Sequence, residues 1–200
     1  MKHVWSTRLF LCALGGALLF AVVLSMSSGQ YDISIEAVIA SFAHAAGLPI
    51  LTDVVVTPEQ EAVLWHIRLP RTLVGLMVGA GLGISGAVLQ GIFSNPLADP
   101  GIIGVSSGAS VGAVLAIGMG VAAGSVLSLP AFAFAGSMLA VSLTVSLSMR
   151  HGRIPVMTLL LSGVVVGMFL AACTAAILTV MNEQKMQQYL FWTIGGLDYR

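Results

Sequence analysis

The chain has 200 residues, of which 58% are hydrophobic and only 8% are charged. A soluble domain carries about 25% charged residues, so this composition excludes a soluble globular protein. The basic and acidic residues balance to a net charge of zero and form no basic block, which argues against nucleic acid as a partner.

Charged residues are absent from four long stretches, 9–31, 72–98, 100–149 and 154–182. Each can hold a membrane span of about 20 residues, and the third can hold two. Charges in hydrocarbon are costly, so this pattern predicts an all-α, polytopic transmembrane helical bundle. We expect one permease-type membrane domain over 1–200, with the lipid bilayer as its surroundings. The expected spans are about 9–26, 72–93, 102–122, 126–149 and 156–181, followed by the start of a sixth.

The first span has two interpretations. Lys2 and Arg8 precede an apolar run that ends in small residues, which is the pattern of a cleaved signal peptide. The run is longer than a usual signal sequence, and more spans follow it. These features favour an uncleaved first helix.

The orientation follows from the basic residues near the spans. If the spans alternate in direction, Lys2 and Arg8 lie on the same side of the membrane as Arg150 and Arg153. The positive-inside rule makes that side cytoplasmic. The segment 30–67 is then outside, and it contains Asp and Glu residues but no Lys or Arg. The loop 94–101 is inside, and the loop 182–188 is outside.

The second span contains the spacing G-x-G-x-x-G at Gly81, Gly83 and Gly86. A dinucleotide-binding loop needs a preceding strand and an acidic residue about 20 positions later, but these glycines lie within an uncharged run and the next acidic residue is Asp99. A stripe of small residues at every fourth position favours helix packing in lipid, and it predicts a central span contacted by other helices. The stripe consists of Gly75, Gly79, Gly83, Ala87 and Gly91.

Enzymatic and ion-coupled functions find little support in these residues. The segment 104–108 matches G-x-S-x-G, but all four histidines lie outside the spans, so an intramembrane serine protease lacks its base. The histidines have no metal-ligand spacing, and we expect no metal site. No G-x-x-x-x-G-K-[ST] motif is present, so any ATP is used by another subunit. Spans without charge or histidine also argue against a secondary transporter.

The segment "WHIRLPR", 65–71, is interpreted as a loop at the outer mouth of the second span. It carries Arg68 and Arg71, three residues apart, which would be neighbours on a helix. Two interpretations stay open. With Trp65 and His66 the segment is typical of interfacial anchoring, whereas positive charge on the outer side suits an acidic docking partner.

The segment "SNPLADPG", 94–101, predicts a rigid inner loop between the second and third spans. Its turn-forming residues are Asn95, Pro96, Asp99 and Pro100. Asp99 either caps a helix or takes part in gating or partner contact.

The continuous block from Trp65 to Ala116 resembles the permease subunits of the FecCD/BtuC family of type II ABC importers. The stretches 159–167 and 189–200 also follow that family's pattern. The resemblance implies an inner-membrane homodimer with its N-terminus in the cytoplasm, a cytoplasmic ABC ATPase dimer and a periplasmic substrate-binding protein. It implies no cofactor bound by this chain, because the partner subunit uses the ATP.

By this resemblance, Arg68 and Arg71 match the arginines that dock the binding protein. The region of the cytoplasmic gate corresponds to Ile154, Pro155, Val156, Met157 and Thr158. The family's coupling helices follow the sixth span, so the sequence corresponds to roughly the first three-fifths of such a subunit.

We therefore expect a non-enzymatic permease subunit that moves a ferric siderophore or haem. A cobalamin permease of the same family and a truncated, non-transporting membrane protein are the alternatives, with the serine protease last.

Overall fold

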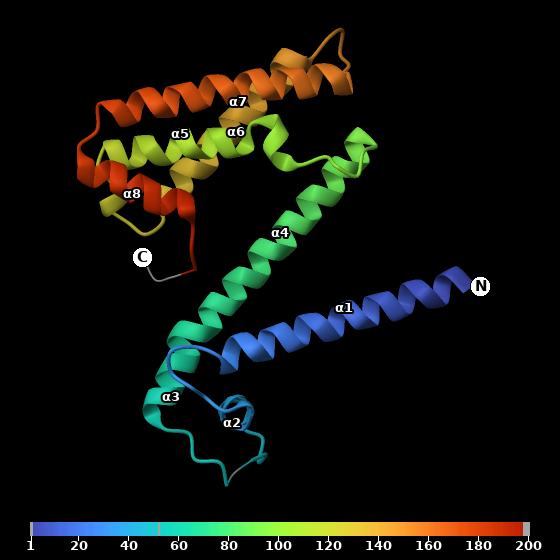
Figure 1. The fold of residues 1–200 in the computed structure, drawn as a ribbon, viewed down its shortest axis with the longest axis vertical. Helices are drawn as coiled ribbons and strands as arrows, with labels where there is room; N and C mark the ends of the chain where they lie inside the picture. Colours follow the sequence, from blue (N-terminus) through green and yellow to red (C-terminus); the bar gives the residue numbers. More distant parts are fainter. Residues whose placement is uncertain (1, 52, 198–200) are drawn as a thin grey trace. The chain divides into compact units, whose positions relative to one another are not determined.

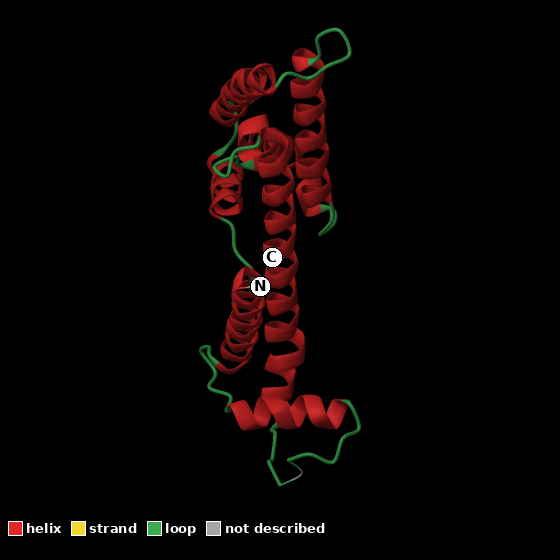
Figure 2. Ribbon diagram, turned by 90° about the vertical axis from the view of Figure 1, so that its right-hand side faces the viewer, coloured by secondary structure: helices red, strands yellow, loops and turns green. Residues whose placement is uncertain are grey.

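The structure is a computed structural model that describes residues 2–51 and 53–197. Over these residues it consists of helices and loops and has no β-sheet (Figures 1 and 2). The described residues form two compact units, the first within 2–79 together with 197 and the second 80–196. The expectation of an all-α membrane protein is confirmed, and that of a single domain over 1–200 stays a prediction.

Four helical segments are long and apolar enough to cross a membrane. They are Thr7–Ser27, Pro58–Phe93, Ser128–Ser148 and Val156–Thr179. They correspond to four of the five expected spans.

The expected third span, 102–122, is not one continuous helix. It begins as a 3-10 helix, η2 (Pro100–Ile103), continues as α5 (Val105–Gly118) and ends in a second short 3-10 helix, η3 (Val121–Ala123). Gly104 separates the first two pieces with φ of 86°, a left-handed conformation that glycine adopts without a steric cost.

The first unit begins with α1 (Lys2–Ser27), followed by α2 (Ile35–Ala45) and α3 (Pro58–Val63). Ser34 caps α2, its hydroxyl accepting the Ala37 N–H at 3.2 Å. A capping box between Thr57 and Gln60 begins α3. The caps therefore set where both short helices start.

An apolar core holds this unit together. Its buried members are Met26, Ile33, Ala37, Val38 and Leu64. At its edge, the Trp65 ring lies 5.0 Å from that of Phe42, and the Trp65 indole N–H donates to the Ser41 hydroxyl at 3.0 Å. The indole thus buries its ring with its polar group satisfied.

The segment 65–71 is helical, so its interpretation as a loop was wrong. A π-helical turn, η1 (Leu64–Arg68), joins α3 to α4 (Leu69–Phe93) without a break. The Leu69 N–H bonds to the carbonyl of Leu64, five residues back. Pro70 has no N–H to donate, so the wider turn falls where the α-helical ladder loses a bond in any case.

The second unit contains α5, α6 (Ser128–Ser148) and α7 (Val156–Thr179), with α5 packed against both of the others (Figure 1). The α5–α6 contact is a close approach of backbones. A Cβ added to Gly108 or Gly112 of α5 would collide with the backbone of α6, and one added to Gly136 of α6 would collide with that of α5. Small residues allow such approach between membrane helices.

The segment 182–188, expected as an outer loop, forms the first half of α8 (Glu183–Ile194). Asn182 caps this helix by accepting the Lys185 N–H at 3.0 Å. Tyr189 is buried against α5 in a core with Val114 and Ile117. This 12-residue helix is shorter than the four segments of membrane length, and residues 198–200 lie outside the described ones. The start of a sixth span at the aromatic stretch from Tyr189 stays a prediction.

Candidate functional site

Arg68 lies inside the first unit, with 7% of its surface exposed. Its Nη1 donates to the carbonyls of Met26 at 2.6 Å and Ser27 at 2.8 Å, and its Nη2 donates to the carbonyl of Tyr31. The last carbonyls of a helix have no donor within it, and its C-terminus favours a positive charge. Arg68 therefore caps the C-terminus of α1 from a position about 40 residues away in the chain.

Gly29 belongs to this cap. A Cβ on Gly29 would lie 2.6 Å from Nη2 of Arg68, so a side chain there would displace the guanidinium. The charge of Arg68 therefore faces backbone carbonyls. Its role in docking stays a prediction.

Arg71 is exposed near the start of α4. The residue after it, Thr72, is anchored to α1 by a 2.8 Å hydrogen bond with the Ser25 hydroxyl. Arg68 and Thr72 therefore fix the backbone on both sides of Arg71. This arrangement presents the Arg71 charge from a rigid position, which is what recognition of an acidic group requires.

The glycine stripe of α4 crosses from the first unit into the second. Its one recorded neighbour is the Leu197 side chain, which would lie 3.5 Å from a Cβ on Gly75, an ordinary van der Waals distance. Within the second unit, no described atom lies within 4 Å of a Cβ built on Gly83 or Gly91. Gly79 is equally open within the first unit. The packing role of the stripe stays a prediction.

The close helix contacts of the second unit involve glycines that the sequence analysis did not select. Gly108 and Gly112 are four residues apart, as are Gly136 and Ala140 on α6. The same small-residue spacing could have identified them.

The loop after α4 contains two side-chain turns. The Asn95 carboxamide oxygen accepts the Leu97 N–H at 2.9 Å, and the Asp99 carboxylate accepts the Gly101 N–H at 2.7 Å. Asp99 therefore caps η2, and Pro100 is the first residue of that helix. Of the alternatives open for Asp99, the structure contains the capping contact. Pro96 and Asn95 are exposed.

The expected gate region, 154–158, surrounds the start of α7, with Pro155 as the residue that precedes the helix. Ile154, Val156 and Met157 are exposed apolar residues, and Thr158 is half-buried. The arginines belong to the first unit, whereas the gate region and the inner loop belong to the second. The roles of these residues stay predictions.

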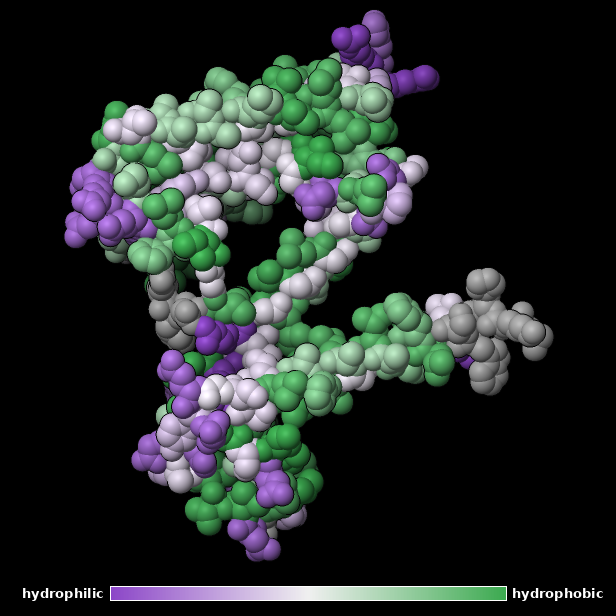
Figure 3. All heavy atoms as spheres, viewed as in Figure 1, coloured by the Kyte–Doolittle hydropathy of each residue, from purple (hydrophilic) through white to green (hydrophobic). Residues whose placement is uncertain are grey.

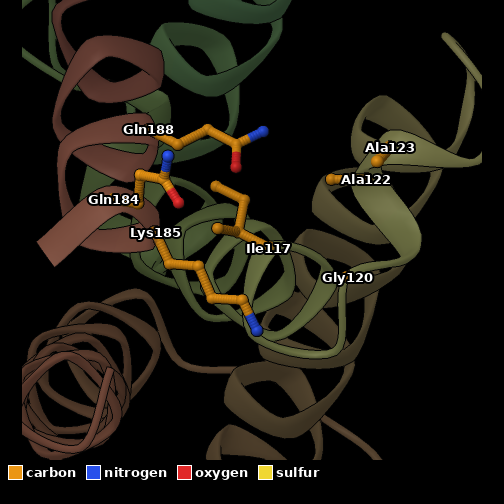
Figure 4. Close-up of a pocket in the computed structure, with 7 residues that line it drawn as sticks. All are labelled: Ile117, Gly120, Ala122, Ala123, Gln184, Lys185 and Gln188. Atoms are coloured by element: carbon orange, nitrogen blue, oxygen red, sulfur yellow. The ribbon is translucent and has the colours of Figure 1, made fainter. Parts of the chain in front are cut away.

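A hollow of about 400 Å³ lies between α8 and the end of α5 (Figure 4). Lys185 reaches across from α8, and its Nζ donates to the carbonyl of Gly118 at 2.6 Å. The hollow is lined by Ile117, Gly120, Ala122, Ala123, Gln184, Lys185 and Gln188. The sequence analysis missed this feature, although Asn182 followed by Glu183 is a helix-start signal.

The described residues contain no group of three or more His, Cys, Asp or Glu side chains placed to hold a metal ion. Their prominent polar contacts join a cation to carbonyls at the C-terminus of a helix, once in each unit. These contacts fix the end of α1 to η1 and the end of α5 to α8.

Comparisons with known proteins agree on one family. The sequence model of the FecCD transport family matches residues 17–200. The vitamin B12 import permease BtuC of Escherichia coli is 39% identical over 147 residues, which are 72% of this chain and 44% of the relative. BtuC of Shigella boydii is 35% identical over the same lengths.

A solved structure also matches the fold. It is an inward-facing ABC transporter described as of the metal-chelate type, with a TM-score of 0.76 and 30% sequence identity. The match covers 95% of this chain and 54% of that one, so the chain spans about half the length of the relatives it matches. Because the family model matches nearly the whole chain, the protein belongs to the FecCD transport family and is a multi-pass membrane protein.

Proposed function

We propose that this chain forms part of the permease of an ABC importer that depends on a binding protein. The observation that carries the proposal is the family match over residues 17–200. The proposed assembly is an inner-membrane homodimer with a cytoplasmic ATPase dimer and a periplasmic binding protein. In it the N-terminus lies in the cytoplasm and the chain holds no cofactor, because ATP is used by the partner.

The proposed cargo is a metal chelate. The BtuC relatives are described as vitamin B12 permeases, and the solved neighbour as a metal-chelate transporter. Vitamin B12 is itself a large organic ligand around a metal ion. The relatives favour cobalamin over the ferric siderophore or haem that we expected first, and those two remain the next candidates.

The proposed mechanism is alternating access. ATP binding and hydrolysis in the partner bias two states of the permease, and a loaded binding protein adds contacts that differ between them. The close backbone contacts of Gly108, Gly112 and Gly136 suit a pair of helices, α5 and α6, that moves as one body. The exposed apolar residues of 154–158 are proposed to close the cytoplasmic end of the path.

Docking of the binding protein is proposed to rest on Arg71. Its side chain is exposed near the start of α4. The guanidinium of Arg68 is buried and donates to three backbone carbonyls. Arg68 would act by positioning α1 and the start of α4, and Arg71 would meet a carboxylate of the partner.

The change Arg71→Glu tests this assignment, because it places like charges opposite each other at the contact. We expect the affinity of the binding protein for the reconstituted permease to fall about tenfold or more, and the loss to be largest at low salt. Arg150→Glu, at the opposite end of the predicted topology, is the control and should leave that affinity unchanged. An unaltered affinity for Arg71→Glu would remove Arg71 from the docking surface.

The cargo is tested by the ATPase rate of the assembled importer after addition of a binding protein loaded with cobalamin, a ferric siderophore or haem. We expect cobalamin to give the largest stimulation. A response to the siderophore alone would reverse the proposed order, and an equal response to empty binding protein would leave no role for any of the three.

A further inference from the structure

The turn between α6 and α7 is a tight hairpin. The backbones of Arg150 and Arg153 exchange two hydrogen bonds, of 2.9 and 3.0 Å. His151 and Gly152 between them have φ of 51° and 75°, and positive values at both central residues are typical of a type I′ turn. Arg150 and Arg153 are therefore directly paired.

This pairing brings two positive charges together. Directly opposite residues of a hairpin have Cβ atoms about 5 Å apart, and like charges in such a pair repel. Both arginines are exposed, and no salt bridge to either is found in the part of the chain that the structure describes. An anion between the two guanidinium groups would remove the repulsion.

The second unit offers no acidic side chain for this purpose among its described residues. Only Asp99 and Glu183 are acidic there. The carboxylate of Asp99 accepts the Gly101 N–H, and that of Glu183 lies 3.5 Å from the amide nitrogen of Gln187. Neither carboxylate pairs with the hairpin, so the two charges are left to water, salt and any anion from outside this unit.

The place of the hairpin indicates the source of such an anion. Both helices that it joins are long and apolar enough to cross a membrane, and they end at Ser148 and begin at Val156. The turn must then lie at the level of the lipid headgroups. Figure 3 shows it as a hydrophilic tip on a mostly apolar body.

We propose that the hairpin Arg150–Arg153 binds the phosphate of an anionic phospholipid. The guanidinium group forms paired hydrogen bonds with phosphate oxygens, and two of them on one rigid turn complement a single headgroup. The bound lipid would hold the adjoining ends of α6 and α7 at the membrane surface. This inference needs only the membrane location of the chain and does not rest on the proposed cargo or docking.

The test is a lipid titration of the native protein in detergent, followed by native mass spectrometry with phosphatidylglycerol and phosphatidylcholine. Each arginine at a membrane surface contributes about fivefold in affinity. We expect Arg150→Gln with Arg153→Gln to weaken phosphatidylglycerol binding about 25-fold and leave phosphatidylcholine binding unchanged. The charge-retaining pair Arg150→Lys with Arg153→Lys should keep most of the affinity, and Arg71→Gln should match the wild type.

Three results would overturn the proposal. They are full phosphatidylglycerol affinity in the doubly neutral variant, an equal loss for both lipids, and displacement of the lipid by inorganic phosphate at the same concentration. If the double variant fails to fold, the single changes Arg150→Gln and Arg153→Gln decide the matter. Each should lower the affinity about fivefold.

Discussion

The cap that Arg68 places on α1 yields a quantitative prediction for Arg68→Met. Methionine keeps an apolar stem of similar length but removes the donors to the carbonyls of Met26, Ser27 and Tyr31. A buried acceptor left without a donor costs about 1–3 kcal/mol. Water reaches part of this site, because only the bond to Met26 is fully buried. We therefore expect a loss of about 3 kcal/mol in the free energy of unfolding.

The assay is the thermal unfolding midpoint in mild detergent. A loss of 1 kcal/mol shifts the midpoint by about 2–4 °C in a chain of this size, so Arg68→Met should melt roughly 6–12 °C below the wild type. Protease cleavage in the segment 28–34, which follows α1, should also become faster. The control is Arg8→Met, at an exposed arginine of α1, which should change stability by less than about 0.5 kcal/mol.

Two results would refute this reasoning. A midpoint for Arg68→Met within about 1 °C of the wild type would mean that the three carbonyl contacts contribute little net stability. Equal shifts for Arg68→Met and Arg8→Met would mean that loss of charge, rather than loss of the cap, controls the stability.

Three further predictions concern single contacts. Gly112→Ala should destabilise the protein by about 1–3 kcal/mol because its Cβ meets the backbone of α6. The control Gly91→Ala meets no neighbouring atom within its unit and should be neutral or stabilising. Equal thermal unfolding midpoints for the two variants would contradict the close packing of α5 and α6. Lys185→Met should cost about 1 kcal/mol and speed amide hydrogen exchange in α8, and unchanged exchange would mean that the contact does not hold that helix. Thr57→Ala should remove the capping box and cost about 1 kcal/mol, measured by chemical denaturation; a serine at that position should restore the stability.

Helix existence could be predicted well from the sequence, because lipid enforces long apolar runs. The expected span 126–149 is observed as α6 over 128–148, and 156–181 as α7 over 156–179. Local capping was equally accessible, since Asp99 followed by Pro100 forms the capped turn that those residue types favour.

The errors arose where tertiary contacts or backbone geometry decide. Pro70 and the nearby charges suggested a loop, but a π-helical turn accommodates the proline and keeps the helix continuous. The stripe on α4 and the pair Gly108 and Gly112 have the same spacing, and no local rule says which of them packs within its own unit. The partners of Arg68 lie about 40 residues away, beyond the reach of any motif.

The proposed role in import is tested most directly by uptake into proteoliposomes. They would contain the native protein as its own cell makes it, its ATPase and its binding protein, and would be supplied with radiolabelled cobalamin, ferric siderophore or haem. We predict that at least one chelate accumulates, that accumulation requires ATP, and that Arg71→Glu lowers it. If none of the chelates accumulates while the ATPase hydrolyses ATP and the binding protein is loaded, the proposed permease function is wrong.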